Sequence, residues 1–253
     1  MTGDHPILVE ACVDSVASAR AAERGGAHRV ELCDALFDGG TTPSAGMIAA
    51  CREAVSIPVF VMIRPRGGSF VYSEEERDVM RRDIVVAREI GAEGVVIGGL
   101  LPNGNIDLAL VSALVDAARG VPVTFHRAFD LTPDLEASLE SLAEAGVRRI
   151  LTAGGASTAA EGTSLLGTLV RRAGSRIVVM AGGGVREENV GEMAARSGVR
   201  EVHVRLTRLT RGEALPSRRE LRVRRALPND EAAWEETDEQ RVRSFVDAVV
   251  RLA

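Results

Sequence analysis

Two short apolar stretches of the chain each carry a carboxylate and a thiol, spaced two residues apart. Glu10 and Cys12 lie in the run Val-Glu-Ala-Cys-Val-Asp, and Glu31 and Cys33 lie in the similar run Val-Glu-Leu-Cys-Asp. Side chains of a β-strand alternate between its two faces, so each carboxylate points the same way as its thiol. If the two runs are neighbouring parallel strands, two carboxylates and two thiols meet at one place.

Further polar side chains end other apolar runs. Arg64 ends one of them, His126 and Asp130 lie in the motif Phe-His-Arg-Ala-Phe-Asp, and His203 alternates with valines between Glu201 and Arg205. A buried charge is costly unless a partner replaces its water, so these groups are expected to face a shared polar interior. Any one of them could be a lining residue without chemistry. Together they predict an acid–base site, with the candidate catalytic residues Glu10, Glu31, Arg64, His126, Asp130 and His203.

Two glycine-rich segments follow later apolar runs. One contains Gly154 and Gly155, and the other contains Gly182, Gly183 and Gly184. Glycines leave backbone N–H groups free to approach a phosphate or a carboxylate, which makes both segments candidate ligand-binding loops. Tight turns between strands and helices also favour glycine, so the alternative of a purely structural turn stays open.

The two cysteines of the repeated run are candidate metal ligands. Thiolates favour soft ions, so Cys12 and Cys33 could hold Cu(I). Their spacing is not that of a zinc site, because the chain has neither Cys-x-x-Cys nor a close pair of histidines. Buried cysteine is also an ordinary small core residue, and Cys51, which lies in a helical pattern, is expected to be one.

The elements that position these residues alternate regularly along the chain. Eight runs rich in Val and Ile are typical of buried parallel strands, and they are expected at 7–13, 29–33, 58–64, 93–98, 121–128, 149–153, 176–182 and 200–206. Helical stretches separate them, and glycines that suit C-caps end four of these: Gly25, Gly91, Gly146 and Gly198. This order predicts an α/β fold, a single-domain (β/α)8 TIM-type barrel spanning 1–253, with an open eight-stranded sheet as the alternative. Functional side chains of such a barrel gather at the carboxyl ends of its strands.

The regular alternation stops after the eighth strand. Residues 207–229 are rich in arginine and show little periodicity, and 238–252 have the pattern of a closing helix. The segment is a long insertion in the eighth loop of the catalytic face. Its arginines could bind an anion or a partner subunit, or could simply be solvated.

Composition excludes several classes of function. The net charge of −5 gives no reason to expect nucleic acid or a membrane as partner, and no apolar run approaches spanning length. Three cysteines, an odd number, favour reduced thiols and a cytoplasmic protein. All 31 basic residues are arginine, so a lysine Schiff base and lysine-bound pyridoxal phosphate are excluded.

Taken together, these motifs closely resemble the CutC copper-homeostasis family over roughly residues 7–206. The resemblance implies a TIM-type barrel, a cytoplasmic location, Cu(I) as ligand at Cys12 and Cys33, and a homo-oligomer. It is carried by the stretches 10–15, 31–33, 39–44, 62–68, 125–130, 151–152 and 182–186.

Two functions of different class are therefore expected. The first is copper homeostasis through Cu(I) binding. The second is an isomerase or lyase acting on a small anionic, possibly phosphorylated, substrate, with Glu10 or Glu31 as base, His126 as acid and Arg64 as anion clamp. In either case the sulfurs of Cys12 and Cys33 are expected about 4–8 Å apart and unbonded.

Overall fold

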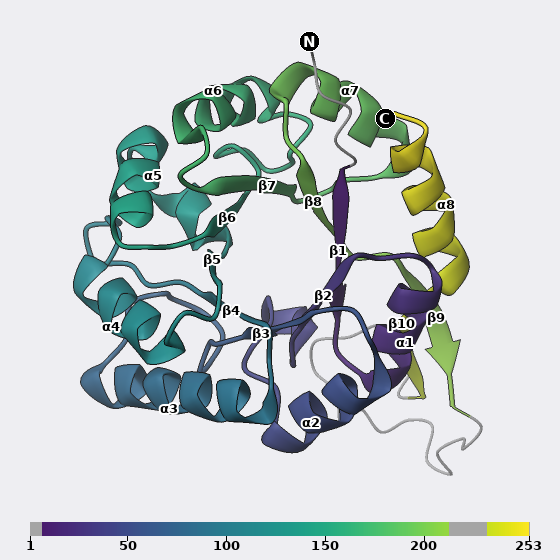
Figure 1. Cartoon of the computed structure of the whole chain (residues 1–253), viewed down its shortest axis with the longest axis horizontal. Helices are drawn as coiled ribbons and strands as arrows, with labels where there is room; N and C mark the ends of the chain where they lie inside the picture. Colours follow the sequence, from purple (N-terminus) through teal and green to yellow (C-terminus); the bar gives the residue numbers. More distant parts are fainter. Residues whose placement is uncertain (1–6, 213–231, 253) are drawn as a thin grey trace, which may run out of the picture.

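The computed structural model describes residues 7–212 and 232–252, and its centre is a closed barrel of eight parallel strands (Figure 1). Each strand pairs with the next, and β1 also pairs with β8, which closes the barrel. The expected (β/α)8 barrel is thereby confirmed and the open sheet is ruled out. The barrel strands are β1 Leu8–Val13, β2 Arg29–Leu32, β3 Val59–Met62, β4 Gly94–Ile97, β5 Val123–Phe125, β6 Arg149–Thr152, β7 Val178–Gly182 and β8 Glu201–Val204.

Helices surround the barrel as an outer ring (Figure 1). Most begin at a side chain that caps their free N–H groups; Ser73, for example, forms a capping box with Glu76 at the start of the longest helix. The α-helices are α1 Val16–Arg24, α2 Ala45–Ala54, α3 Glu74–Ile90, α4 Leu108–Ala118, α5 Leu135–Glu144, α6 Thr163–Ala173, α7 Glu187–Ser197 and α8 Glu239–Val250, and the 3-10 helices are η1 Leu36–Asp38 and η2 Arg127–Leu131.

The expected glycine C-caps are largely as predicted. Gly91 and Gly198 are C-caps with φ of +98° and +76°, and Gly146, with φ of +83°, directly follows the C-cap Ala145. Gly25 differs, because its φ is −73° and the left-handed turn falls to Gly26. A Cβ at Gly25 would lie 2.6 Å from Val242, so this glycine serves the close approach of α8 rather than the turn.

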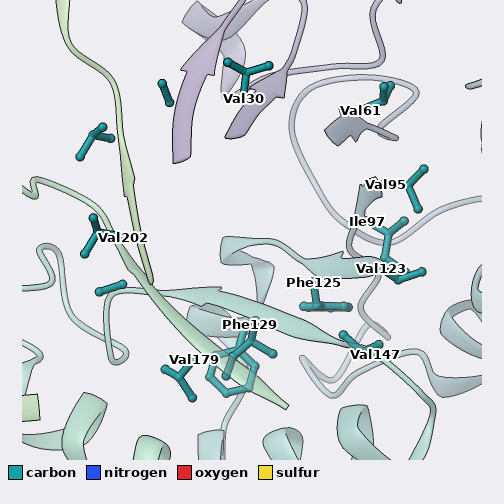
Figure 2. Close-up of a cluster of buried hydrophobic side chains, with 14 of the residues drawn as sticks. Val30, Val61, Val95, Ile97, Val123, Phe125, Phe129, Val147, Val179 and Val202 are labelled. Atoms are coloured by element: carbon teal, nitrogen blue, oxygen red, sulfur yellow. The ribbon is translucent and has the colours of Figure 1, made fainter. Parts of the chain in front are cut away.

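Hydrophobic side chains form two layers, one on each side of the strands. The outer layer lies between strands and helices and includes Val30, Val61, Val95, Val123 and Val202 (Figure 2). Each such buried side chain contributes about 1.5–3 kcal/mol. The inner layer is a smaller cluster inside the barrel, formed by Cys12, Cys33, Phe60, Met62 and Val96. Both cysteines of the repeated run therefore face the barrel interior, as the strand alternation predicts.

The insertion after β8 adds a small sheet beside the barrel. β9 (Thr207–Arg211) and β10 (Ala233–Thr237) pair antiparallel and lie outside the ring, next to α1 (Figure 1). The sequence predicted no strands here, since the short alternation of this segment is weak. Residues 213–231 lie outside the described part of the chain, and so do most of the arginines expected to bind an anion or a partner. Among the described residues, no helix is long and apolar enough to cross a membrane.

Candidate functional site

Strand pairing sets the candidate residues side by side at the carboxyl ends of β1, β2 and β8. Cys12 lies opposite Glu31 in the β1–β2 pair, and Glu10 lies opposite His203 in the β1–β8 pair. Because alternate residues of each strand point inward, Glu10, Cys12, Glu31 and His203 all reach the interior.

Cys12, Glu31 and Cys33 form a compact buried cluster. One donor atom of each, two sulfurs and a carboxylate oxygen, lies within 4.8 Å of the others. The thiol of Cys33 donates to Oε2 of Glu31 at 3.4 Å, and all three cysteines of the chain are free thiols. The expectation that the two sulfurs are close and unbonded is confirmed.

The two thiols differ sharply in acidity. The hydrogen bond with Cys33 and the neighbouring His203 lower the pKa of Cys12 to about 5, against the effect of burial. The same contact and burial raise the pKa of Cys33 well above its usual range. The pair therefore loses its first proton readily and its second with difficulty, so one thiolate is expected at neutral pH.

His203 connects this cluster to Glu10. Its Nδ1 lies 2.7 Å from Oε1 of Glu10, and its Nε2 lies 3.8 Å from Oε2 of Glu31. Burial alone would lower the pKa of His203, but Glu31, Cys12 and Glu10 outweigh burial and hold the pKa well above its usual value. The imidazole is therefore charged and sits between the side chains of Glu10, Glu31 and Cys12.

The two glutamates have opposite ionisation. Burial raises the pKa of Glu10, but Arg29 and His203 outweigh it and lower the pKa to about 2. Burial, together with Cys12 and Glu10, raises the pKa of Glu31 to about 8 against the attraction of His203. Glu10 is thus a fixed anion, whereas Glu31 holds its proton near neutral pH and can exchange it.

A buried ion network that sequence reasoning missed lies beneath the cluster. Arg29 donates to Glu10 at 2.5 Å and to Glu201 at 2.7 Å, and Arg149 donates to Glu201 at 2.5 Å. The Cζ atoms of Arg29 and Arg149 also lie 4.7 and 5.4 Å from the ring centroid of Phe60. The signal that could have revealed the network is the alternation Arg29, Glu31, Cys33, which puts Arg29 on the same inner face.

Arg64 lines the mouth of the barrel together with His203. Its Nη1 donates to the backbone oxygens of Asp38 and Gly40 at 2.9 and 3.0 Å, and its Nη2 donates to that of Gly68 at 2.9 Å. Only Nε has no hydrogen-bond partner among the described residues. The guanidinium therefore ties the loop after β2 to the loop after β3, and three of its five N–H groups are used within the protein.

His126 also lines the mouth and is neutral. Its Nδ1 accepts the backbone N–H of Ala128 at 3.1 Å, and burial together with the charge of Arg64 lowers its pKa to about 3. A neutral imidazole whose Nδ1 accepts carries its proton on Nε2. That Nε2 is buried and has no partner among the described residues.

Asp130 and the first glycine loop form a second cluster, which borders the mouth through Arg127. Asp130 accepts from Arg127, from the hydroxyl of Thr152 and from the N–H groups of Ala153 and Gly155. The N–H of Gly154 donates to Thr152. The backbone N–H groups of Gly154 and Gly155 already donate to Thr152 and Asp130, so they are not free to donate to a ligand.

The candidate residues around the cysteines line one cavity of about 190 Å³ at the mouth of the barrel. Its polar lining consists of Cys12, Glu31, Cys33, Arg64, Arg127, His126 and His203. Glu10 is buried behind it, and Asp130 is not part of it. Gly183 and Gly184 of the second glycine loop line an adjoining cavity, whereas Gly182 ends β7.

Comparison with known proteins decides the family. The sequence matches the model of the CutC family over residues 7–207. The chain belongs to the CutC family. A CutC relative from Mus musculus, named copper homeostasis protein cutC homolog, is 52% identical over 196 residues, covering 78% of this chain and 72% of its own.

CutC relatives also match over the full barrel and in three dimensions. A CutC family protein of Chromobacterium violaceum is 43% identical over 96% of this chain and 98% of its own length. The crystal structure of CutC from Streptococcus agalactiae has a TM-score of 0.75 at 38% identity, covering 78% of this chain and 97% of its own. Phosphoribosylanthranilate isomerase of Thermotoga maritima, at 15% identity and a TM-score of 0.55, shares the barrel fold alone.

Proposed function

We propose that this CutC protein binds Cu(I) through Cys12 and Cys33 and takes part in copper homeostasis. The observation that carries the proposal is the cluster of two free thiols and one carboxylate whose donor atoms lie within 4.8 Å of one another. Thiolates are the protein ligands that soft Cu(I) prefers. The name of the mouse relative is consistent with this role.

The protonation of the cluster suits a monovalent ion. With one thiolate supplied by Cys12 and a neutral Glu31, a bound Cu(I) would be close to charge-balanced inside the barrel. The charged His203 disfavours a second positive charge nearby, which selects against divalent ions. The site needs reduced thiols, so we propose a cytoplasmic location.

Competition with a Cu(I) chelator tests the proposal. The double variant Cys12→Ser/Cys33→Ser is expected to lose near-stoichiometric binding, because it has no thiolate in the mouth. Cys51→Ser is the matched control, since Cys51 is buried in α2, and it is expected to bind normally. Tight binding by the double variant would refute the site, and unchanged copper sensitivity of a deletion strain would refute the physiological role.

A homo-oligomer remains a prediction from the family resemblance. Light scattering at micromolar concentration tests it, and a monomer would contradict it.

A second candidate function is acid–base catalysis on a small molecule. It is favoured by two buried atoms in the mouth that have no partner among the described residues, Oε1 of Glu31 and Nε2 of His126. Copper binding by the thiols gives neither atom a role. In this function the ionised form of Glu31, whose share grows as the pH approaches the pKa of about 8, removes a proton from carbon next to a carbonyl. The N–H of His126 then stabilises the enolate oxygen.

Proton exchange with solvent tests this second candidate. Metal-free protein in D2O is expected to exchange a C–H proton of a small carbonyl compound, with the proton passing to Glu31 and a deuteron returning. Glu31→Gln should stop the exchange, whereas Glu192→Gln on the surface should not. Exchange that persists in Glu31→Gln would rule out Glu31 as the base.

A further inference from the structure

A second cavity of about 300 Å³ adjoins the barrel mouth, between the loops that follow β7 and β8. It shares the lining residues Arg127, Leu151 and His203 with the mouth cavity. A ligand that occupies one cavity can therefore extend into the other. Many barrels bind a phosphate between the loops after their seventh and eighth strands, which is where this cavity lies.

The charged side chains that line the second cavity are all basic. Among the described residues, its charged lining side chains are Arg127, Arg186, Arg205 and His203, and none of them is a carboxylate. Arg127 pairs with Asp130 and Arg205 with Glu235, whereas Arg186 forms no ion pair among the described residues. The cavity thus has an excess of positive charge, which suits a dianion better than a neutral group.

Backbone conformation keeps this cavity open. Gly183 and Gly184 have φ of +99° and +68°, and a Cβ at Gly183 would lie 2.9 Å from Nη1 of Arg127. A side chain there would therefore press on the arginine that both cavities share. The loop leads directly into α7, where Glu187 and Glu188 in the first turn offset the partial positive charge of the helix N-terminus, so the arginines carry the positive charge of the cavity.

The mouth cavity supplies a second, independent anchor. His126 is 5% exposed, its Nδ1 is engaged by the N–H of Ala128, and its protonated Nε2 has no partner among the described residues. Leaving a buried donor unpaired costs about 1–3 kcal/mol, so the site gains when a ligand oxygen accepts from it. Such an acceptor is a carbonyl or hydroxyl oxygen.

We infer that the two cavities form one site for a small phosphate ester. Its carbonyl or hydroxyl oxygen accepts from Nε2 of His126 in the mouth, and its phosphate lies among Arg127, Arg186 and Arg205. The inference rests on the proposed acid–base function, which places the carbonyl end of the ligand at His126. It adds that the ligand is a phosphate ester. The two volumes fit a compound of a few carbons and are too small for a dinucleotide.

Calorimetry on the metal-free, reduced protein tests the inference with three probes: dihydroxyacetone phosphate, inorganic phosphate and dihydroxyacetone. Dihydroxyacetone phosphate is expected to bind at least tenfold more tightly than either fragment, because it engages both cavities. Inorganic phosphate is expected to displace it competitively. Equal affinity for dihydroxyacetone phosphate and inorganic phosphate, or non-competitive behaviour, would overturn the two-part site.

Two variants separate the two ends. Arg186→Ala is expected to weaken both phosphate compounds about tenfold. Arg196→Ala, on the helix that begins after Arg186 and paired with Glu192, should change neither. His126→Asn keeps an acceptor for the N–H of Ala128 and removes the Nε2 donor. It is expected to weaken dihydroxyacetone phosphate about tenfold and to leave inorganic phosphate unchanged. Unchanged affinities in Arg186→Ala would overturn the phosphate position even if His126→Asn failed to fold.

Failure of this inference differs from failure of the acid–base candidate. Binding of dihydroxyacetone phosphate without deuterium exchange would remove the enzyme and keep the site. Exchange on an unphosphorylated carbonyl compound, without tighter binding of the phosphate ester, would keep the enzyme and remove the phosphate position.

Discussion

Replacing Glu10 by glutamine tests whether the ion network inside the barrel holds a charged carboxylate. The Glu10 side chain is fully buried and receives hydrogen bonds from Arg29 at 2.5 Å and from His203 at 2.7 Å. Glutamine keeps the size of the side chain and removes its charge. Arg29 then retains Glu201 as its only carboxylate, and the single amide oxygen of glutamine replaces one of the two acceptors that served Arg29 and His203.

The expected loss can be worked out in two ways that agree. A pKa of about 2 for Glu10 in the folded protein, against an ordinary value of 4.5, corresponds to about 3 kcal/mol of stability. Breaking a buried ion pair by removing one partner typically costs about 3–5 kcal/mol. In a protein of this size, about 3 kcal/mol lowers the melting temperature by about 6–12 °C.

Thermal unfolding followed by circular dichroism at pH 7 measures the effect. The matched control is Glu192→Gln, which breaks an exposed pair with Arg196 whose side chains are 74% and 60% accessible. That pair is expected to be worth less than about 1 kcal/mol. A Glu10→Gln variant that melts within about 2 °C of the control would refute the charged network.

The dependence on pH gives a further check with a definite sign. The pKa of Glu10 is lower in the folded protein than in the unfolded chain, so the carboxylate stabilises the fold above pH 4.5. This contribution declines as the pH falls from 4.5 through about 2. The difference in stability between wild type and Glu10→Gln should therefore be constant from pH 5 to 8 and shrink in acid. A difference that grows in acid would contradict the assignment.

Three other predictions concern the thiols, the loop after β6 and the packing inside the barrel. Thiolate absorbance near 240 nm should rise by one equivalent around pH 5, and this rise should be absent in Cys12→Ser. Burial raises the pKa of Cys51 to about 11, so Cys51 should contribute no absorbance below pH 9. An absorbance that does not rise below pH 7 would contradict the low pKa of Cys12. Asp130→Asn should lower the melting temperature by about 2–12 °C, because it weakens the acceptor that binds Thr152, Ala153, Gly155 and Arg127, worth about 1–3 kcal/mol. Gly94→Ala should cost about 1–3 kcal/mol in urea unfolding, since its Cβ would lie 2.5 Å from the Phe60 ring, which is held under two arginines. Gly46→Ala in the open first turn of α2 is its control and should be neutral or stabilising by up to about 1 kcal/mol.

Much of the architecture could be predicted because buried parallel strands and amphipathic helices have distinct patterns. Runs of Val and Ile separated by helical stretches predicted eight strand–helix units, and the barrel follows once β1 pairs with β8. Strand alternation alone placed Glu10, Cys12, Glu31, Cys33 and His203 in the interior. The small sheet of β9 and β10 was missed because its strands are half exposed and lack a buried apolar run.

The electrostatic roles could not be predicted, because they depend on partners distant in the sequence. Glu10 and Glu31 occur in nearly the same local sequence, yet burial beside Arg29 keeps one charged while burial without such a partner keeps the other neutral. Arg64 looked available to an anion, but its terminal nitrogens are taken by carbonyl oxygens of residues 38, 40 and 68. Residue type identifies a group that can do chemistry, whereas the fold decides which of its atoms remain unpaired.

The ion network beneath the cysteines limits the path by which a bound ion can leave the barrel interior. Glu10, Arg29, Arg149 and Glu201 are each less than 10% exposed, and together they fill the interior on the amino-terminal side of the thiols. Nothing bound at Cys12 and Cys33 can leave in that direction without breaking three buried ion pairs. An ion that binds there as proposed must therefore enter and leave through one opening, on the face that carries the loops after the strands.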